Sequence, residues 1–224
     1  REAIRHIDGP LLVLAGAGSG KTRVITEKIT SLIKRRIVEP QCIAAITFTN
    51  KAANEMRARL RQKDSKSKTW ISTFHTLGLR ILRHEFEKLG YRPGFSIMDS
   101  KDSENLIADI LRRTPANDMP EIRAIQNKIS AFKSALTTPS EALAADQPDP
   151  IARLAAVCYG QYDEALKAFN AVDFDDLIMR PVSLLQTDVE SCKYWRDEIR
   201  YLLVDEYQDT NLSQYELVRL LVGD

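Results

Sequence analysis

Residues 11–22 read LLVLAGAGSGKT, in which a short apolar run leads into a glycine-rich loop that ends in Lys21 and Thr22. The loop fits the phosphate-binding template G-x-x-x-x-G-K-[ST] except at its first position, which is Ala15. A loop of this kind, between a buried strand and a helix, aims backbone N–H groups and the helix dipole at phosphate oxygens. The stretch therefore predicts a nucleoside triphosphate site on a parallel α/β sheet.

The loop residues share one expected task, which is to surround the phosphates. We assign to nucleotide binding Ala15, Gly16, Ala17, Gly18, Ser19, Gly20, Lys21 and Thr22. The three glycines allow the backbone to wrap tightly, and Ala15 is compatible with an ordinary negative φ. Lys21 is expected to reach the β- and γ-phosphates, and the Thr22 hydroxyl is expected to bind Mg²⁺.

A second motif completes this site. Residues 201–206 read YLLVDE, an apolar strand that ends in two adjacent carboxylates. Sites on parallel sheets form at the carboxyl ends of the strands. We expect Asp205 to contact Mg²⁺ and Glu206 to orient and deprotonate the attacking water. A glutamate beside the aspartate favours hydrolysis over transfer to an acceptor.

Strand and helix patterns alternate along much of the chain. Four apolar runs predict buried parallel strands, at residues 11–15, 43–48, 69–73 and 201–205. Each is followed by a helical pattern, at residues 21–34, 51–61, 74–89 and 213–221. This alternation predicts an α/β fold with a parallel sheet and right-handed crossovers.

The stretch from about residue 90 to 186 has helical periodicity and almost no strand signal. We expect a helix capped by Asp99 or Ser100, helices over 121–136 and 151–169, a turn-rich break over 139–150, and a helix from Asp173 that bends or ends at Pro181. The sheet is thus predicted to be interrupted by a helical insertion subdomain of roughly 100 residues. The predicted boundaries are 1–78 and 187–224 for the nucleotide-binding domain and 79–186 for the insertion.

Composition and charge fit a folded domain. The 224 residues are 44% hydrophobic and 28% charged, so a substantial core can form. The net charge of +1 neither favours nor excludes a nucleic-acid partner. Three widely spaced cysteines, the lack of a long apolar run and the lack of a signal-peptide pattern predict a soluble cytoplasmic protein. Because the sequence begins without Met and stops directly after an apolar helix, we expect a piece of a longer protein.

Five motifs in order, AGAGSGKTRVI, AITFTNKAANEM, ISTFHTLGLRIL, DFDDLI and YLLVDEYQDTN, resemble those of superfamily 1A DNA helicases. The resemblance is to the UvrD/Rep/PcrA family, especially its Rep branch, and covers essentially the whole chain. It implies a RecA-like P-loop NTPase domain that uses ATP and Mg²⁺. It also implies 3′→5′ movement on single-stranded DNA, unwinding at junctions between single and double strands, and replication or repair proteins as partners.

The resemblance also implies roles for single residues. Arg23 would pack on the adenine, and Gln208 would link the nucleotide site to the parts that respond to DNA. The DNA contacts would come from Thr47, Phe48, Thr49, Asn50, Thr73 and His75. Phe48 would stack on a base, which suits a translocase because every base has a π-face. From the residues alone, Phe48 would be a core residue and His75 a capping or packing residue.

Two other groups have structural interpretations. In DFDDLI, Asp173 is expected to cap a helix, with Asp175 and Asp176 in its first turn, rather than to bind a metal. The basic residues Arg112, Arg113, Lys128 and Lys133 would lie on solvated helix faces, with contact to duplex DNA as the alternative.

The resemblance is incomplete at both ends of the sequence. The family's adenine-reading glutamine would precede Arg1, and its second RecA-like domain, which supplies arginines to the γ-phosphate, would follow Asp224. We therefore expect weak nucleotide binding and poor hydrolysis by these 224 residues alone. Three alternatives remain open: the motor of a RecB/AddA-type helicase–nuclease, a P-loop NTPase without a DNA role, and a module that only binds nucleotide or DNA.

Overall fold

The computed structural model describes residues 2–16, 18–63, 68–113, 121–147 and 149–223. Its internal contacts divide the chain into two compact units. The first unit comprises Arg1–Leu77, Val189–Thr210 and Val218–Asp224, and the second comprises Gly78–Asp188 and Asn211–Leu217. The first unit is therefore assembled from segments that lie far apart in the sequence.

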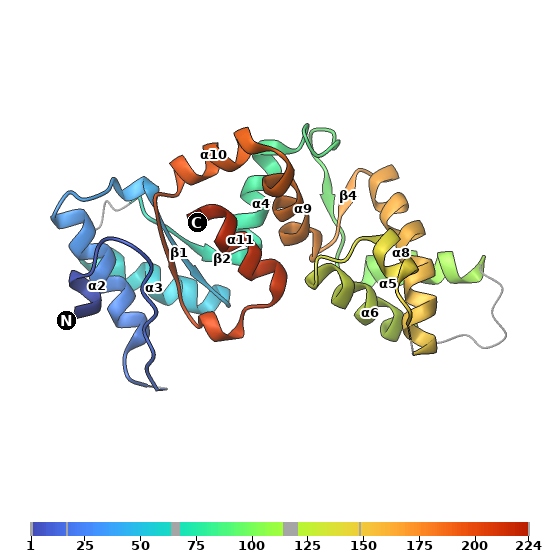
Figure 1. Ribbon diagram of the computed structural model, residues 1–224, viewed down its shortest axis with the longest axis horizontal. Helices are drawn as coiled ribbons and strands as arrows, with labels where there is room; N and C mark the ends of the chain where they lie inside the picture. The colour runs from blue at the N-terminus through green and yellow to red at the C-terminus, as the bar shows by residue number, and fades with distance from the viewer. Residues whose placement is uncertain (1, 17, 64–67, 114–120, 148, 224) are drawn as a thin grey trace. The chain divides into compact units, whose positions relative to one another are not determined.

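A parallel sheet forms the centre of the first unit (Figure 1). Among the described residues it has three strands in the order β2-β1-β5. They are β1 (Ile43–Thr47), β2 (Trp70–Thr73) and β5 (Tyr201–Val204). Ala45 of β1 pairs with Ile71 of β2 and with Leu203 of β5. The predicted α/β class and parallel sheet are confirmed.

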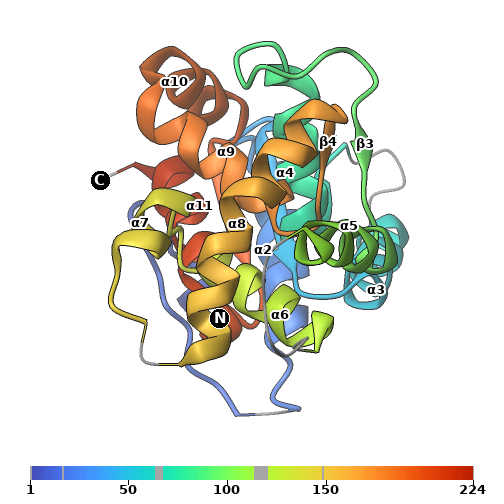
Figure 2. The same ribbon diagram turned by 90° about the vertical axis from the view of Figure 1, so that its right-hand side faces the viewer.

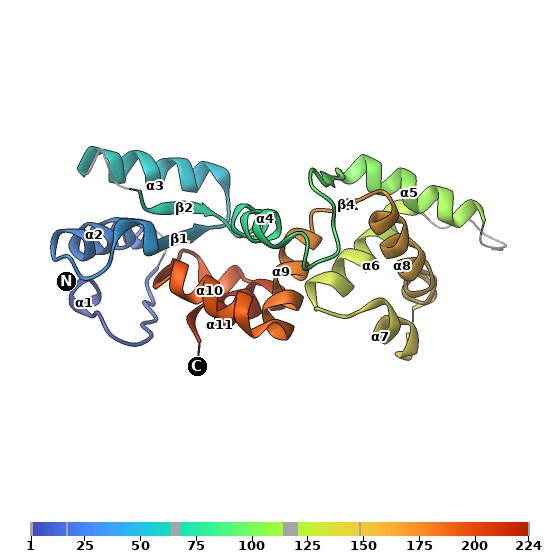
Figure 3. The same cartoon turned by 90° about the horizontal axis from the view of Figure 1, so that it is seen from above.

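Two amphipathic helices pack with this sheet. They are α2 (Lys21–Lys34) and α3 (Asn50–Lys63), and Figure 3 shows α3 running along β2. The five residues of β1 are all buried, which explains why the strand is a continuous apolar run. The core of the unit consists of Ile29, Leu32, Ile43, Ala45, Ala53, Met56, Leu60 and Ile71.

The predicted strand over residues 11–15 is wrong. This segment has no regular secondary structure, and its leucines are exposed, Leu12 by 67% and Leu14 by 86%. An apolar run gives a strand only when a neighbouring strand pairs with its backbone groups. Within the part of the chain that the structure describes, β5 pairs only with β1. The segment therefore keeps strand-like composition without the ladder that would bury it.

Helices dominate the second unit, as Figure 2 shows. The helices α5 (Ser100–Arg112), α6 (Ile122–Ser134), α7 (Pro139–Ala144) and α8 (Pro150–Ala168) pack against one another. Asp99 caps α5 with a capping box that includes Asp102, which confirms the first of the two predicted caps. The unit also contains a short parallel pair that the sequence did not predict, β3 (Ser96–Ile97) with β4 (Ala171–Val172). Pairs of two residues are too short to give a periodic signal.

Part of the predicted turn-rich break is helical. Residues 139–144 form α7, with the Thr138 side chain accepting a hydrogen bond from the N–H of Glu141. The Glu141 side chain accepts from the N–H of Thr138 in return, and Pro139 occupies the first turn. Proline is compatible with that position because the first-turn N–H has no acceptor within the helix. The prediction overlooked the capping box in TPSE.

The helix α9 (Asp176–Thr187) continues through Pro181. Of the bend or end that was predicted at this proline, the end is wrong. Proline removes the hydrogen bond to the carbonyl four residues earlier, which belongs to Leu177. That carbonyl oxygen faces Gly78, in α4 (Phe74–Glu85): a Cβ added to Gly78 would lie 1.7 Å from it. The absence of a side chain at Gly78 allows this close approach between two backbones.

The remaining elements are α1 (Glu2–Arg5), α10 (Val189–Glu198), α11 (Leu212–Val222) and two 3₁₀ turns, η1 (Pro40–Cys42) and η2 (Tyr207–Asp209). Asn211 caps α11, since its side-chain oxygen accepts a 2.9 Å hydrogen bond from the N–H of Gln214. The described helices include none with the length and apolarity that a membrane span needs.

Candidate functional site

The glycine-rich loop leads directly into the first turn of α2. Gly20, which precedes this helix, has φ 92° and ψ 26°, and Gly18 has φ 73°. Side chains with a Cβ rarely adopt these left-handed angles, so glycine is needed at both positions. The Ser19 hydroxyl donates a 2.7 Å hydrogen bond to the carbonyl of Gly16 and closes the turn. Ala17, which was also assigned to the loop, lies outside the described residues.

Lys21 lies at the point where the loop meets the carboxylates of the second motif. Its ammonium group donates a 3.1 Å hydrogen bond to the carbonyl of Ala15. The same nitrogen lies 3.6 Å from Glu206 Oε2. The Lys21 side chain is 24% exposed, so it remains accessible from solvent. It is therefore a cation held at the loop and available to a phosphate group.

Thr22 and Asp205 form the second link between the two motifs. The Thr22 hydroxyl donates a 3.0 Å hydrogen bond to Asp205 Oδ2. Asp205 is buried, and its Oδ1 accepts a 3.2 Å hydrogen bond from the N–H of Glu206. The N–H of Asp205 donates to the carbonyl of Ile46 at 2.8 Å, which extends the β5 ladder by one residue. The sheet thus fixes this carboxylate beside the first turn of α2.

Glu206 adopts a backbone conformation that is unusual for a residue with a side chain. Its φ is 52° and its ψ is 44°, in the left-handed region. Such angles cost about 1–3 kcal/mol and are common at functional sites. Glu206 Oε2 accepts a 2.6 Å hydrogen bond from the side-chain amide of Gln208. The half-exposed carboxylate of Glu206 thus lies between Lys21 and Gln208.

The oxygen atoms of this site fit the preferences of Mg²⁺. That ion takes oxygen ligands and is usually held by one or two carboxylates together with waters and substrate phosphates. Thr22 Oγ1 and the Asp205 carboxylate supply such oxygens within 3.0 Å of each other. The described residues contain no cluster of three or more His, Cys, Asp or Glu side chains suited to a metal. The donor set matches a metal that is shared with phosphates.

Arg23 points into solvent from the first turn of α2. Its side chain is 81% exposed, and its Nε lies 3.9 Å from Glu27 Oε1. Glu27 also forms an ion pair with Lys63 of α3. Exposed pairs of this kind hold a side chain only weakly, because water and salt screen the two charges. Arg23 is therefore free to turn towards a ligand at the loop.

The residues after β1 divide into a buried and an exposed group. Thr47 is 1% exposed, and its hydroxyl donates to the carbonyl of Thr49 at 3.1 Å. Phe48 is half-buried and meets Phe74 edge-on, with ring centroids 5.8 Å apart. Thr49 and Asn50 are exposed where α3 begins. Thr47 thus supports the loop, while its three neighbours are accessible.

A similar division follows β2. Thr73 is buried, and its hydroxyl accepts a 3.3 Å hydrogen bond from the N–H of Thr76. This bond ties the strand end to the start of α4. His75 is half-buried, and burial lowers the pKa of its imidazole below the ordinary value. A neutral ring at physiological pH suits stacking or hydrogen bonding better than an ion pair.

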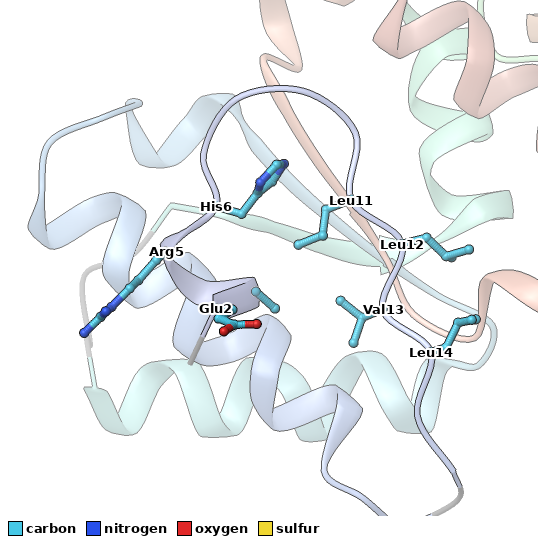
Figure 4. Close-up of a pocket in the computed structure, with 8 residues that line it drawn as sticks. Glu2, Arg5, His6, Leu11, Leu12, Val13 and Leu14 are labelled. Carbon is cyan, nitrogen blue, oxygen red and sulfur yellow. The ribbon is translucent and has the colours of Figure 1, made fainter.

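A hollow of about 600 Å³ lies on the N-terminal side of the loop (Figure 4). Figure 4 shows Leu11 and Val13 pointing to one side of the chain and Leu12 and Leu14 to the other. The lining consists of Glu2, Ala3, Arg5, His6, Leu11, Leu12, Val13 and Leu14. None of these residues belongs to the group formed by Lys21, Thr22, Asp205 and Glu206, so the hollow is separate from the phosphate site.

In the second unit, Asp173 and Asp176 form a buried ion cluster with Lys133. The Lys133 ammonium donates to Asp173 Oδ2 at 2.7 Å and lies 2.9 Å from Asp176 Oδ1. Burial alone would lower the pKa of Lys133, but the charges of Asp176 and Asp173 outweigh it and raise that pKa. Lys133 is 0% exposed, so its predicted place on a solvated or DNA-contacting face is wrong. The reason is that both carboxylates point inwards and require a buried cation.

Asp173 accepts from the first N–H of α9, as the predicted cap would, but α9 begins at Asp176, and Asp175, which directly precedes it, makes no side-chain capping bond. Asp173 Oδ1 accepts a 2.9 Å hydrogen bond from the N–H of Asp176, and Asp176 Oδ2 accepts one of 3.3 Å in return. Asp175, between them, is half-buried, and burial together with the charge of Asp173 raises its pKa to about 6. Phe174 is 58% exposed. The segment DFDDLI therefore serves the structure of the second unit.

The spacing of residues on α6 could have predicted the burial of Lys133. Ile125, Ile129 and Lys133 are spaced by four residues on α6, and their exposed fractions are 0%, 2% and 0%. A lysine that continues an apolar stripe indicates burial with an acidic partner. Lys128 lies on α6 off this stripe, and Arg112 is the last residue of α5; they form exposed pairs with Asp149 and Asp109.

Comparison with known proteins agrees with the geometry. A sequence model of the UvrD/REP helicase N-terminal domain matches residues 1–224. The chain is 50% identical over its whole length to ATP-dependent DNA helicase Rep of Escherichia coli, strain K12, and covers 33% of that protein. It is 48% identical to the Rep protein of Salmonella typhimurium, again over 100% of this chain and 33% of the relative. It is 41% identical to ATP-dependent DNA helicase PcrA of Staphylococcus aureus over 99% of the chain and 31% of the relative.

The chain thus spans about a third of the length of the curated relatives it matches. The match covers the phosphate loop, the carboxylates after β5 and all segments between them. The chain therefore belongs to the UvrD/REP helicase family and corresponds to its N-terminal domain.

Proposed function

We propose that this chain is the ATP-binding part of a DNA helicase that couples ATP hydrolysis to 3′→5′ movement on single-stranded DNA. The observation that carries the proposal is the junction of the two motifs, in which Lys21 and Thr22 contact Glu206 and Asp205. The relatives named ATP-dependent DNA helicase support it. In this proposal the first unit is a RecA-like P-loop domain. Its reaction is the cleavage by water of the bond between the β- and γ-phosphates of ATP.

Each residue of the site has a proposed task. Lys21 exchanges its contact with the Ala15 carbonyl for the β- and γ-phosphate oxygens, and loop N–H groups bind the same phosphates. Thr22 and Asp205 hold Mg²⁺, which when bound neutralises phosphate charge. Glu206 orients the attacking water and accepts its proton.

Two further residues belong to this proposed site. Arg23 packs on the adenine. Gln208 holds the Glu206 carboxylate through their 2.6 Å hydrogen bond and connects it to the response to DNA.

The proposed DNA surface lies at the ends of β1 and β2. Exposed or half-exposed residues there, Phe48, Thr49, Asn50 and His75, contact single-stranded DNA, with Phe48 stacking on a base. Thr47 and Thr73 are buried and act by fixing these loops. Both strands belong to the sheet that carries Asp205, so DNA and nucleotide contacts share one rigid element.

We further propose the domain organisation 1–78 and 187–224 for the RecA-like part, interrupted by a helical insertion at 79–186. The helical second unit supports this division. The second unit also includes residues 211–217, which the proposed division assigns to the RecA-like part. The proposed substrates are ATP, single-stranded DNA and junctions between single and double strands. Replication or repair proteins are the proposed partners, and the cytoplasm is the proposed location.

ATP hydrolysis by the intact protein, with Mg²⁺ and with or without single-stranded DNA, tests the proposal. We expect slow hydrolysis alone and strong stimulation by the DNA. Hydrolysis that does not respond to DNA would indicate a P-loop NTPase with no DNA role. A lack of both ATP binding and hydrolysis would overturn the proposed site itself.

A further inference from the structure

Lys28 is a buried cation that the proposed reaction does not use. It lies in the middle of α2, and it is 4% exposed. A lysine that is this deeply buried normally pairs with a carboxylate, because desolvation of its charge is costly. Lys28 instead contacts neutral groups, and burial, reinforced by the charge of Arg35, lowers its pKa. Its surroundings therefore need another explanation.

Among the described residues, Lys28 contacts the N-terminal segment and Tyr201, which in turn contacts that segment. The ammonium group donates hydrogen bonds to the carbonyls of Ala3, at 3.1 Å, and Ile4, at 3.4 Å. It also lies 5.7 Å from the centre of the Tyr201 ring, within the range of a cation–π interaction. The Tyr201 hydroxyl donates in turn to the carbonyl of Ile7 at 3.4 Å. Two side chains thus hold three backbone carbonyls of residues 3–7.

These carbonyls need such donors. Ala3 and Ile4 lie in α1, a helix of four residues that packs beside α2 in Figure 3. The last carbonyls of a helix receive no hydrogen bond from an N–H of the same helix. A lysine is a favourable donor to them. Lys28 therefore ties the end of α1 to the flank of α2, and Tyr201 ties the following turn to β5.

The contacts of Lys28 and Tyr201 with residues 3–7 lie close in the chain to the nucleotide site. Lys28 and Lys21 are seven residues apart, so they share one face of α2 and are separated by roughly 10 Å along its axis. The chain leaves the tie at Ile7 and enters the phosphate loop at Ala15. The intervening residues 11–14 have no strand ladder, so they do not fix the start of the loop. Upstream of the loop, the chain is therefore held by the contacts of Lys28 and Tyr201 with residues 3–7, and downstream it continues into α2.

We infer that Lys28 is a positioning residue for nucleotide binding, acting by fixing the segment that carries the chain into the phosphate loop. This inference rests on the proposed ATP site. Lys28 contacts neither Thr22 nor the carboxylates of Asp205 and Glu206. Its loss should weaken ATP binding because the loop becomes less ordered, while the hydrolysis step at Glu206 is preserved.

The test compares Lys28→Met with Lys28→Arg and with Lys34→Met, which removes an exposed lysine from the same helix. The intact protein is assayed for the KM and kcat of ATP hydrolysis and for the Kd of ATP. We expect Lys28→Met to raise KM and Kd about tenfold with kcat unchanged, as for supports of a binding site. Lys28→Arg should recover most of the affinity, and Lys34→Met should behave as the wild type.

Two other measurements keep the test decisive. If Lys28→Met does not fold, Tyr201→Phe removes only the donor to the Ile7 carbonyl and should raise KM in the same sense. Hydrogen exchange of residues 2–7 should accelerate in either variant. A fall in kcat with unchanged KM, or unchanged KM and Kd in a folded variant, would overturn the inference while the proposed function stands. A wild type that does not bind ATP would overturn both.

Discussion

The Thr22 hydroxyl donates a 3.0 Å hydrogen bond to Asp205, a residue 183 positions further along the chain. This bond joins the helix that follows the phosphate loop to the strand that ends in the two carboxylates. It places the two side chains that are proposed to hold Mg²⁺ next to each other. The site is therefore preorganised by the packing of α2 and β5 in the first unit.

Thr22→Val should increase the Mg²⁺ requirement of ATP hydrolysis. Valine keeps the shape of threonine but lacks the oxygen, so Asp205 loses its hydrogen bond and the metal loses a ligand. We expect the Mg²⁺ concentration for half-maximal hydrolysis to rise about tenfold or more. Thr26→Val, one turn further along α2, removes a hydroxyl that donates to the Arg23 carbonyl and serves as the control. An equal Mg²⁺ dependence in both variants would exclude Thr22 as a ligand.

Phe48→Ala should weaken binding of single-stranded DNA without a change in ATP affinity. Stacking of a base on an aromatic ring contributes about 1–3 kcal/mol, so the Kd for DNA should rise between about fivefold and a hundredfold. Fluorescence anisotropy with a labelled oligonucleotide measures this directly. Phe169→Ala, which removes a 62% exposed phenylalanine in the second unit, is the matched control. Equal losses of DNA and ATP affinity would instead indicate that Phe48 supports the sheet through Phe74.

Gly78→Ala should destabilise the second unit. A Cβ at this position would lie 1.7 Å from the Leu177 carbonyl oxygen, a distance that requires α4 and α9 to separate. Overpacking of this kind costs about 1–3 kcal/mol or more. Gly160→Ala in α8 is the control, since no atom lies within 4 Å of its Cβ and alanine is the better helix former by about 0.5–1 kcal/mol. Urea unfolding should therefore show changes of opposite sign, and a neutral Gly78→Ala would contradict the close approach.

Lys133→Met should be the most destabilising of the lysine substitutions in the second unit. It leaves Asp173 buried without its cation and Asp176 with Arg180, whose Nε lies 3.2 Å from Asp176 Oδ1, and breaking a buried pair in this way costs about 3–5 kcal/mol. Lys128→Met removes a half-exposed pair with Asp149 and should cost at most about 1 kcal/mol. The free energy of unfolding in urea separates the two cases. Equal values would mean that the buried cluster contributes no more than a surface pair.

The nucleotide site was largely predictable from the sequence because its parts are local motifs. A loop of fixed spacing before a helix specifies Lys21 and Thr22, and an apolar strand that ends in carboxylates specifies Asp205 and Glu206. The structure brings these four residues together, since strand ends of a parallel sheet share one edge. The strands β1, β2 and β5 also followed from their apolar runs, for the same local reason.

Other features depend on partners that a sequence pattern does not contain. Residues 11–14 have the composition of a strand, but a strand forms only with a neighbour that pairs with it. The helix through Pro181 persists because Gly78, about a hundred positions earlier, leaves room for the carbonyl that proline releases. The charge of Lys133 suggested a solvated helix face, whereas the carboxylates of Asp173 and Asp176, about forty positions further along the chain, surround it in the interior.

Single-turnover ATP hydrolysis by Glu206→Gln, in the intact protein with single-stranded DNA, tests the role of the second carboxylate. In the proposed mechanism, Glu206 accepts the proton of the attacking water while Lys21 and the loop bind the phosphates. We predict that hydrolysis falls by at least about a hundredfold with the Kd for ATP unchanged, and that Glu190→Gln, an exposed control, matches the wild type. Hydrolysis at the wild-type rate in Glu206→Gln would contradict the claim.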